Sequence, residues 1–193
     1  DTDVADNPIS RGAGHFTVTV NGKKINIVSL HLWPHPYWYG TDDRETSEAN
    51  KEGDQYRVFE MQYIIDQTIK NPDYADEKYW IFGGDTNSKS RLDNWFYGFE
   101  SNSTRLLAHD LLLNNTEMKD IIGCRYPGSF ISSTHSDNRI DILYVSPEVY
   151  NMIDNASMII DEWLAEGTKS EYVPSFYNRS DHRPMIVDID LSK

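Results

Sequence analysis

The chain has 193 residues, of which 38% are hydrophobic and 12% aromatic, and this composition predicts a folded domain with a hydrophobic core rather than a disordered chain. A formal net charge of −13 does not predict a broad basic surface for nucleic acid, although bound divalent cations could supply positive charge locally. No apolar run approaches the roughly 20 residues that a membrane-spanning helix needs, and the one cysteine, Cys124, excludes an intrachain disulfide.

The N-terminal part of the chain predicts a β-hairpin. Residues 16–20, Phe-Thr-Val-Thr-Val, alternate as a half-buried strand does. Asn21-Gly22 is a strong signal for a two-residue hairpin turn, and residues 24–30 read as the returning strand. We therefore expect a hairpin over residues 16–30, with His31 at or just beyond the end of its second strand.

The next segments predict a loop, a helix and a buried strand. Residues 33–55 read as a long loop, whose first half is aromatic and contains two prolines. Apolar residues recur at helical spacing between Arg57 and Lys70, and Asn71-Pro72 ends that pattern. Residues 79–82, Tyr-Trp-Ile-Phe, are wholly apolar, as expected of a strand that is covered on both faces.

The remaining pattern predicts an α/β domain. Helices are expected over residues 92–99 and around 106–113, and strands over 140–145, 185–189 and, more briefly, 158–160. Strands and helices interleave, and candidate polar groups stand at strand ends, where an α/β scaffold places its chemistry. The sequence contains no internal repeat and no linker that would divide it, so we expect a single domain over residues 1–193.

Four short polar strings adjoin the predicted strands. They are Ser29-Leu30-His31-Leu32, Gly84-Asp85-Thr86-Asn87, Arg139-Ile140-Asp141-Ile142-Leu143-Tyr144 and Ser180-Asp181-His182-Arg183-Pro184. Each of them supplies an acid, an amide or an imidazole. On local evidence each also has a structural interpretation, because Gly, Asp and Asn are common turn residues and a lone histidine is more often structural than catalytic.

Asp141 is the most informative of these residues when it is taken alone. It lies between Ile140 and Ile142 in a strongly apolar strand, where a buried carboxylate is costly unless it has a partner. On the structural interpretation, that partner is Arg139 or a backbone amide.

Taken together and in this order, the four strings resemble the endonuclease/exonuclease/phosphatase superfamily, the deoxyribonuclease I-like phosphoesterases. The resemblance implies a four-layered α/β sandwich, in which two packed mixed sheets are flanked by helices. It implies hydrolysis of a phosphodiester or phosphomonoester by in-line attack of activated water, with Mg²⁺ or Mn²⁺ as the cofactor. The substrate class stays open between nucleic acid, a phospholipid head group and another small phosphoester.

The resemblance also implies a role for each polar residue. Asp85 would take a proton from the attacking water or orient it, and would share the metal with Asp181. Asn87 would hold the scissile phosphate or a metal-bound water.

The same resemblance assigns charge stabilisation to two histidines. His31 would hydrogen-bond a phosphate oxygen and stabilise charge in the transition state. Asp141 would pair with His182 and fix the tautomer of its ring, which faces the phosphoryl oxygens or the water.

Family members usually begin with a strand that bears an Asn and a second strand that carries a metal-binding Glu. No glutamate precedes Glu45 in this sequence. We therefore expect the chain to be the C-terminal part of a longer protein and, by itself, to bind a divalent metal weakly. The missing ligands are the best support for the alternative function, a non-catalytic binding or scaffold module that retains the fold. Against this alternative, every catalytic string that this part of the family's sequence could contain is intact.

The aromatic segment 33–39, Trp-Pro-His-Pro-Tyr-Trp-Tyr, begins two residues after His31. Its rings could overhang the site and stack on a substrate, which would make the segment a determinant of substrate choice. Alternatively, the aromatic rings pack on one another and pin the loop.

Overall fold

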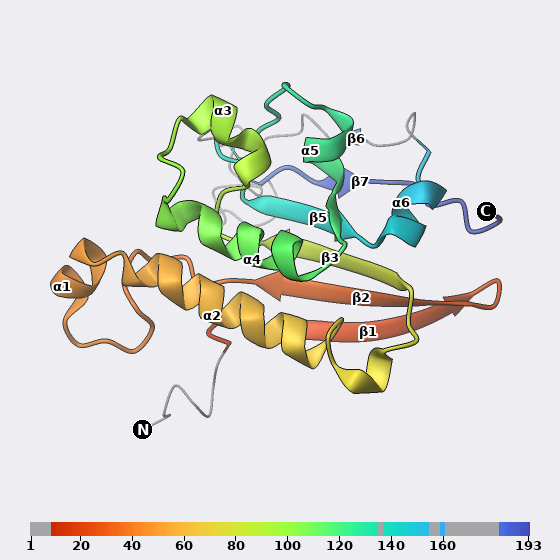
Figure 1. Cartoon of the computed structure of the whole chain (residues 1–193), viewed down its shortest axis with the longest axis horizontal. Coiled ribbons are helices and arrows are strands. Elements are labelled where there is room, and N and C mark those ends of the chain that lie inside the picture. Colours follow the sequence, from red (N-terminus) through yellow and green to blue (C-terminus); the bar gives the residue numbers. More distant parts are fainter. Residues whose placement is uncertain (1–8, 135–136, 155–158, 161–181) are drawn as a thin grey trace, which may run out of the picture.

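The structure is a computed structural model that describes residues 9–134, 137–154, 159–160 and 182–193. Its centre is a five-stranded mixed sheet with the strand order β1-β2-β3-β5-β4 (Figure 1). These strands are β1 (Ala13–Val20), β2 (Lys23–His31), β3 (Tyr79–Asp85), β4 (Lys119–Asp120) and β5 (Asp141–Val145). β2 and β3 are parallel, whereas the other neighbouring pairs are antiparallel. A second, antiparallel sheet is formed by β6 (Ile159–Ile160) and β7 (Met185–Ile186).

The predicted N-terminal hairpin is confirmed. All of β1 pairs with β2, from Val20 opposite Lys23 to Ala13 opposite Leu30, and Asn21 and Gly22 join the strands with φ values of 51° and 76°. Positive φ at both central residues is the geometry of the type I′ turn, whose twist matches that of the strands. His31 is the last residue of β2, as the sequence predicts.

The helices differ from the predictions mainly in their boundaries. Their bounds are α1 (Arg44–Ala49), α2 (Glu52–Gln67), α3 (Asn94–Tyr97), α4 (Leu107–Asn115), α5 (Ile121–Arg125) and α6 (Pro147–Met152), with 3₁₀ turns at Pro72–Tyr74, Arg91–Asp93 and Thr104–Leu106. The predicted helix over residues 92–99 is therefore split between a 3₁₀ turn and α3. None of the helices within the described ranges is long and apolar enough to cross a membrane.

The expectation of a loop over residues 33–55 is wrong in its second half, because α1 and the start of α2 lie there. Asp43 caps α1, since its side chain accepts a hydrogen bond of 3.1 Å from the Thr46 backbone N–H. Gly53, in the first turn of α2, donates its N–H to the Pro36 carbonyl at 3.0 Å. A Cβ atom on Gly53 would lie 2.3 Å from the His35 carbonyl oxygen, so the absence of a side chain lets the helix begin against this loop.

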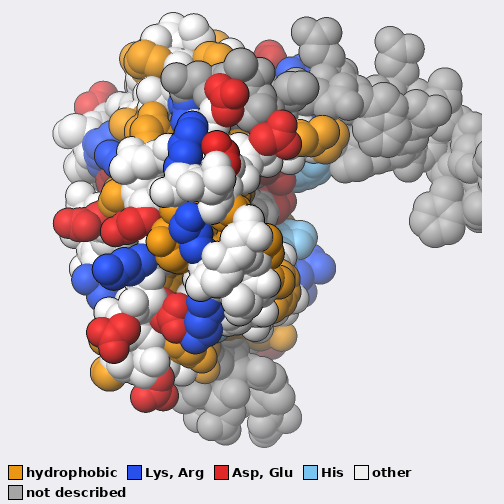
Figure 2. Space-filling model, turned by 90° about the vertical axis from the view of Figure 1, so that its right-hand side faces the viewer, with side chains coloured by type: hydrophobic (Ala, Val, Ile, Leu, Met, Phe, Trp, Pro, Cys, Tyr) orange, Lys and Arg blue, Asp and Glu red, His pale blue; other side chains and the backbone are white. Residues whose placement is uncertain are grey.

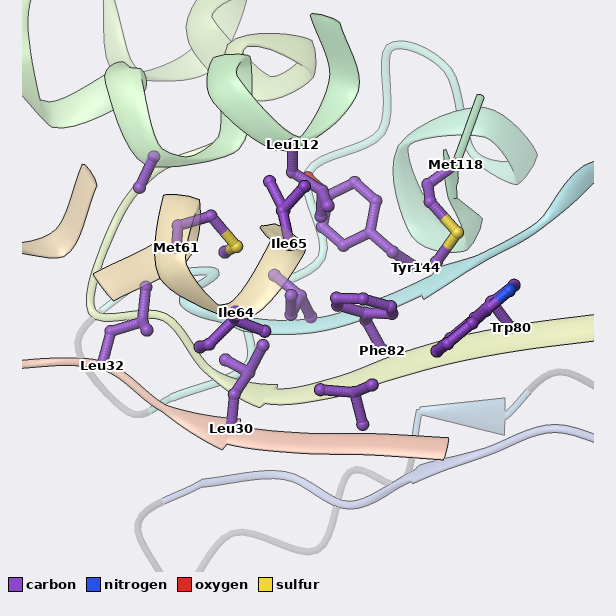
Figure 3. Packing of buried hydrophobic residues seen from close by; sticks show 13 residues of the cluster. Leu30, Leu32, Met61, Ile64, Ile65, Trp80, Phe82, Leu112, Met118 and Tyr144 are labelled. Carbon is purple, nitrogen blue, oxygen red and sulfur yellow. The ribbon is translucent and has the colours of Figure 1, made fainter. Parts of the chain in front are cut away.

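α2 and α4 lie side by side over one face of the main sheet (Figure 1). The apolar periodicity that predicts α2 is the reason, because Met61, Ile64 and Ile65 are all buried against the strands. Trp80 and Phe82 of β3 point toward the helices in the same cluster (Figure 3). Side chains of this kind each contribute about 1.5–3 kcal/mol when they are fully buried.

The opposite face of the main sheet carries a second apolar cluster. Ile81 and Leu143 alternate with the residues that face the helices, and they pack with Met185 of β7 and with residues of α5 and α6. β3 is therefore covered on both faces, as its wholly apolar sequence predicts. Only the first two residues of the strand predicted over 185–189 form a ladder, and Ile189 makes an isolated bridge to Ile153.

Candidate active site

Three of the predicted site residues form a row across the carboxyl end of β3. The parallel register of β2 and β3 places His31 opposite Asp85, and the antiparallel register of β3 and β5 places Asp85 opposite Asp141. Directly paired residues have their side chains on the same face of a sheet. Accordingly, Nε2 of His31 lies 3.8 Å from Oδ2 of Asp85, and the half-exposed His31 ring is accessible to a ligand.

The register depends on Gly84, the residue before Asp85. Gly84 has a φ of +141°, and a Cβ atom built on it would lie 1.9 Å from the backbone oxygen of Leu30. Only glycine combines this conformation with such a close approach of two backbones. Gly84 therefore lets β2 and β3 meet at the point where His31 and Asp85 are brought together.

His182 completes the group through Asp141. Nδ1 of His182 lies 2.8 Å and 3.0 Å from the two carboxylate oxygens of Asp141. This hydrogen bond was predicted from the sequence, and it is confirmed. Hydrogen bonding of Nδ1 to a carboxylate places the ring's other nitrogen on the side away from Asp141, which fixes the direction in which the imidazole can act.

The loop before β5 positions His182. The Ser133 carbonyl accepts a hydrogen bond of 2.8 Å from the Arg183 backbone N–H, and Thr134 forms a β-bridge with His182. The Ser133 hydroxyl accepts a 3.1 Å bond from the Asp141 backbone N–H. Ser133 thus ties the C-terminal segment to the first residue of β5.

Arg139 is not the partner of Asp141, so the structural alternative considered for Asp141 is wrong on this point. Arg139 is 1% exposed, and its Nε lies 2.5 Å from Asp93. Its two terminal nitrogens donate to both carboxylate oxygens of Asp120, at 2.9 Å and 2.7 Å. This bidentate arrangement neutralises the buried guanidinium and leaves the Asp141 carboxylate to His182.

Asn87 turns back on the strand rather than continuing it. Its φ of 47° is left-handed, so Asp85 and Asn87 do not project together as they would from an extended segment. The Asn87 backbone N–H donates to Oδ1 of Asp85 at 2.7 Å, and its side-chain amide donates to the Leu32 carbonyl at 3.0 Å. The turn therefore holds the Asp85 carboxylate in place and ties it to the chain that follows His31.

The environment of Asp85 raises the pKa of its carboxyl group. Burial raises the pKa of this carboxyl above its usual value, whereas the hydrogen bond from the Asn87 N–H lowers it, and the nearby Asp141 charge raises it again. A carboxylate with a raised pKa is a stronger base than an exposed one. This property suits a group that accepts a proton from water.

The acidic and imidazole groups have the chemistry of a divalent metal site. Ligand atoms of Asp85, Asp141 and His182 all lie within 4.8 Å of one another. Because Asp141 and His182 bind each other, Asp85 is the described carboxylate best placed to bind Mg²⁺ or Mn²⁺, both of which prefer oxygen ligands. Asp181, the other metal ligand expected from the sequence, lies outside the described residues.

The aromatic segment 33–39 packs on itself, which is the second of its two interpretations. Trp33 is 9% exposed, and its Nε1 donates to the Tyr37 carbonyl at 2.6 Å. Its ring also meets those of His35, Tyr39 and Tyr56 edge to face. Trp33 is therefore an anchor of the loop and does not offer a stacking surface to a substrate.

Two supporting residues were not identified from the sequence. Glu60 of α2 is fully buried and accepts a hydrogen bond of 2.7 Å from the Trp33 backbone N–H, which fixes the chain just after His31. Lys89 lies two residues beyond Asn87 and points toward Asn138, to which its ammonium group donates. A glutamate within the apolar stripe of a helix and a lysine just after the Gly-Asp-Thr-Asn string are the signals that could have indicated them.

Solved structures provide the comparison with known proteins, since no family model and no curated protein matches the chain. A 3′ phosphatase, NExo from Neisseria, bound to a product DNA hairpin, has 16% sequence identity and a TM-score of 0.54, over 91% of this chain and 64% of that one. The endonuclease domain of TRAS1, a telomere-specific non-LTR retrotransposon, has 14% identity and a TM-score of 0.50, over 97% of this chain and 68% of that one. An endonuclease/exonuclease/phosphatase family protein from Bacteroides thetaiotaomicron has 16% identity and a TM-score of 0.48, over 91% and 53%. The chain thus spans about two thirds of the length of the first two structures.

Proposed function

Because the chain has the deoxyribonuclease I-like α/β fold, we propose that the protein hydrolyses a phosphoester bond, with a divalent metal ion as cofactor. The observation that carries the proposal is the row of His31, Asp85 and Asp141 across three neighbouring strands, completed by His182. These groups come from four distant parts of the sequence. They meet at the carboxyl end of β3, and four unrelated structural roles would not bring them together.

Each residue has a distinct task in the proposed reaction. Asp85 accepts a proton from the attacking water, aided by the burial that raises its pKa. His182, oriented by Asp141, and His31 stabilise charge on the phosphoryl oxygens. Asn87 holds Asp85 in position through its backbone N–H. A bound Mg²⁺ or Mn²⁺, held by Asp85 and Asp181, would supply positive charge that neutralises the phosphate.

Nucleic acid is the substrate class that the comparisons favour. Two of the solved structures that resemble the chain, with TM-scores of 0.54 and 0.50, are a 3′ phosphatase bound to a product DNA hairpin and an endonuclease domain. Phospholipid head groups and other small phosphoesters are the other candidate substrates. The scaffold alternative is not favoured, because the described acid and imidazole groups are assembled in one place.

Hydrolysis of bis(p-nitrophenyl) phosphate and of a 3′-phosphorylated oligonucleotide tests the proposal. The full-length protein should act on at least one of them with Mg²⁺ or Mn²⁺ and lose the activity in EDTA. The Asp85→Asn variant, purified in the same way, controls for contaminating nucleases. Equal rates for the wild type and this variant, or no turnover with either metal, would overturn the proposal.

Replacing Asp141 with asparagine is expected to lower kcat by about 100-fold, because the amide no longer orients the His182 ring as the carboxylate does. Steady-state kinetics of the full-length protein measure the effect. Asp137→Asn is the matched control, because Asp137 is exposed in the same loop region and the chemical change is identical. A similar loss of kcat in both variants would show that the effect is not specific to the Asp141–His182 pair.

A further inference from the structure

A cavity of about 260 Å³ adjoins the candidate active site and shares Asn87 with it. We call it the basic cavity, because four cationic side chains line it, Lys51, Arg57, Lys89 and Arg105. Two acidic side chains, Glu48 and Asp54, also line it. The positive excess is local, since the chain as a whole has a net charge of −13.

The cations of the basic cavity differ in whether a carboxylate already neutralises them. On the face shown in Figure 2, lysine and arginine side chains lie among aspartate and glutamate side chains. Within the cavity, Arg57 is ion-paired with Asp54 and donates to the Trp33 carbonyl at 2.8 Å. The cations that remain to attract a ligand are Lys51, Lys89 and Arg105.

These three cations form no ion pair with a carboxylate in the part of the chain that the structure describes. Lys89 is half-buried, donates to the Asn138 side-chain oxygen and lies 5.4 Å from the centre of the Tyr97 ring. Arg105 is exposed and lies 5.2 Å from the centre of the Phe99 ring. Both cations are thus held by neutral groups, which position the positive charge without neutralising it.

The environment of Lys89 is costly for a cation. Burial and, to a lesser extent, the charges of Arg105 and Arg57 lower the pKa of its ammonium group, and Asp85 opposes them, so that the pKa is about 8. An anion in the cavity would offset this cost. Lys51 and Arg105 are exposed and can turn toward such an anion without unfolding the chain.

We propose that the basic cavity binds a second, non-scissile phosphate group of the substrate. The substrate is then a phosphoester that carries at least two phosphate groups, such as a nucleotide chain or a small bisphosphate. Its role as a substrate subsite rests on the proposed function, whereas the binding of a phosphate does not. Asn87 links the two sites, because it contacts Asp85 on one side and lines the cavity on the other.

Binding in EDTA tests the cavity without requiring turnover. The probe is thymidine 3′,5′-bisphosphate, titrated into the full-length protein by calorimetry. Lys89→Gln and Arg105→Gln should each raise its Kd by about tenfold, the order of one lost charge-assisted hydrogen bond. Lys70→Gln is the matched control. Lys70 is exposed and lies just after the C-terminal end of α2, whereas Lys51 of the cavity precedes its N-terminal end, and the substitution makes the same change in net charge. A parallel titration with inositol 1,4-bisphosphate identifies the source of the phosphate. A lower Kd for the thymidine compound indicates a nucleotide, and a lower Kd for the inositol compound indicates another small bisphosphate.

The outcomes separate this inference from the proposed function. If Kd is unchanged in both Lys89→Gln and Arg105→Gln, the inference is wrong, even where bis(p-nitrophenyl) phosphate is hydrolysed. If Kd rises in these variants but the protein has no metal-dependent hydrolysis, the phosphate site stands and the proposed function fails. If Lys89→Gln fails to fold, Arg105→Gln alone decides the test, because Arg105 is exposed and its replacement should not disturb folding.

Discussion

Replacing Asp85 with asparagine in the full-length protein is expected to lower kcat for phosphodiester hydrolysis by about 10³-fold, within the range for loss of a general base. The amide cannot accept a proton from water, and it also weakens any metal site at this position. The local structure should survive, because the amide oxygen can still accept the 2.7 Å hydrogen bond from the Asn87 N–H. Initial rates with bis(p-nitrophenyl) phosphate at saturating metal measure the effect.

The interpretation of that loss needs evidence that Asp85→Asn is folded. Removing a buried charge next to Asp141 should leave the thermal unfolding temperature unchanged or slightly higher, because Asp85 is desolvated in the native state. Asp137→Asn should retain wild-type kcat, since Asp137 is exposed and is not one of the residues to which the proposed reaction assigns a task. A kcat for Asp85→Asn within about threefold of the wild type would remove Asp85 from the proposed chemistry.

Replacing Gly84 with alanine is expected to lower the free energy of unfolding by about 3 kcal/mol or more. The added Cβ would lie 1.9 Å from the Leu30 carbonyl oxygen, and the φ of +141° is strained for any residue with a side chain. Relief requires β2 and β3 to separate, which also moves His31 away from Asp85. Urea unfolding followed by far-UV circular dichroism measures the change in stability.

Gly83→Ala is the matched control for Gly84→Ala. A Cβ atom on Gly83 would meet the Leu143 side chain at 3.6 Å and the Ile142 carbonyl at 3.7 Å, both ordinary contacts. The stability of this variant should therefore stay within about 1 kcal/mol of the wild type. Equal losses in the two variants would show that strand flexibility, and not the close approach at Gly84, is the reason for glycine at this position.

Short-range signals determined much of the fold from the sequence alone. The alternation of residues 16–20 and the Asn21-Gly22 turn are sufficient for the hairpin, because both act between neighbouring residues. The apolar stripe of α2 likewise predicts which of its faces is buried. The pairing of Asp141 with His182 was also predictable, because a carboxylate within an apolar strand requires a partner and the family resemblance indicated which one.

The tertiary structure alone decided how the polar strings meet. The row of His31, Asp85 and Asp141 depends on which strands are neighbours and on their register. β3 and β5, for example, are neighbours in the sheet although more than fifty residues separate them in the sequence. The same is true of Arg139, whose partners Asp93 and Asp120 lie 46 and 19 positions earlier in the chain. The burial of Trp33 and the basic cavity around Lys89 also arise only when α2 and the following loops pack together. Residue patterns report local preference and burial, whereas register and long-range ion pairs are set by packing between segments that the linear sequence does not connect.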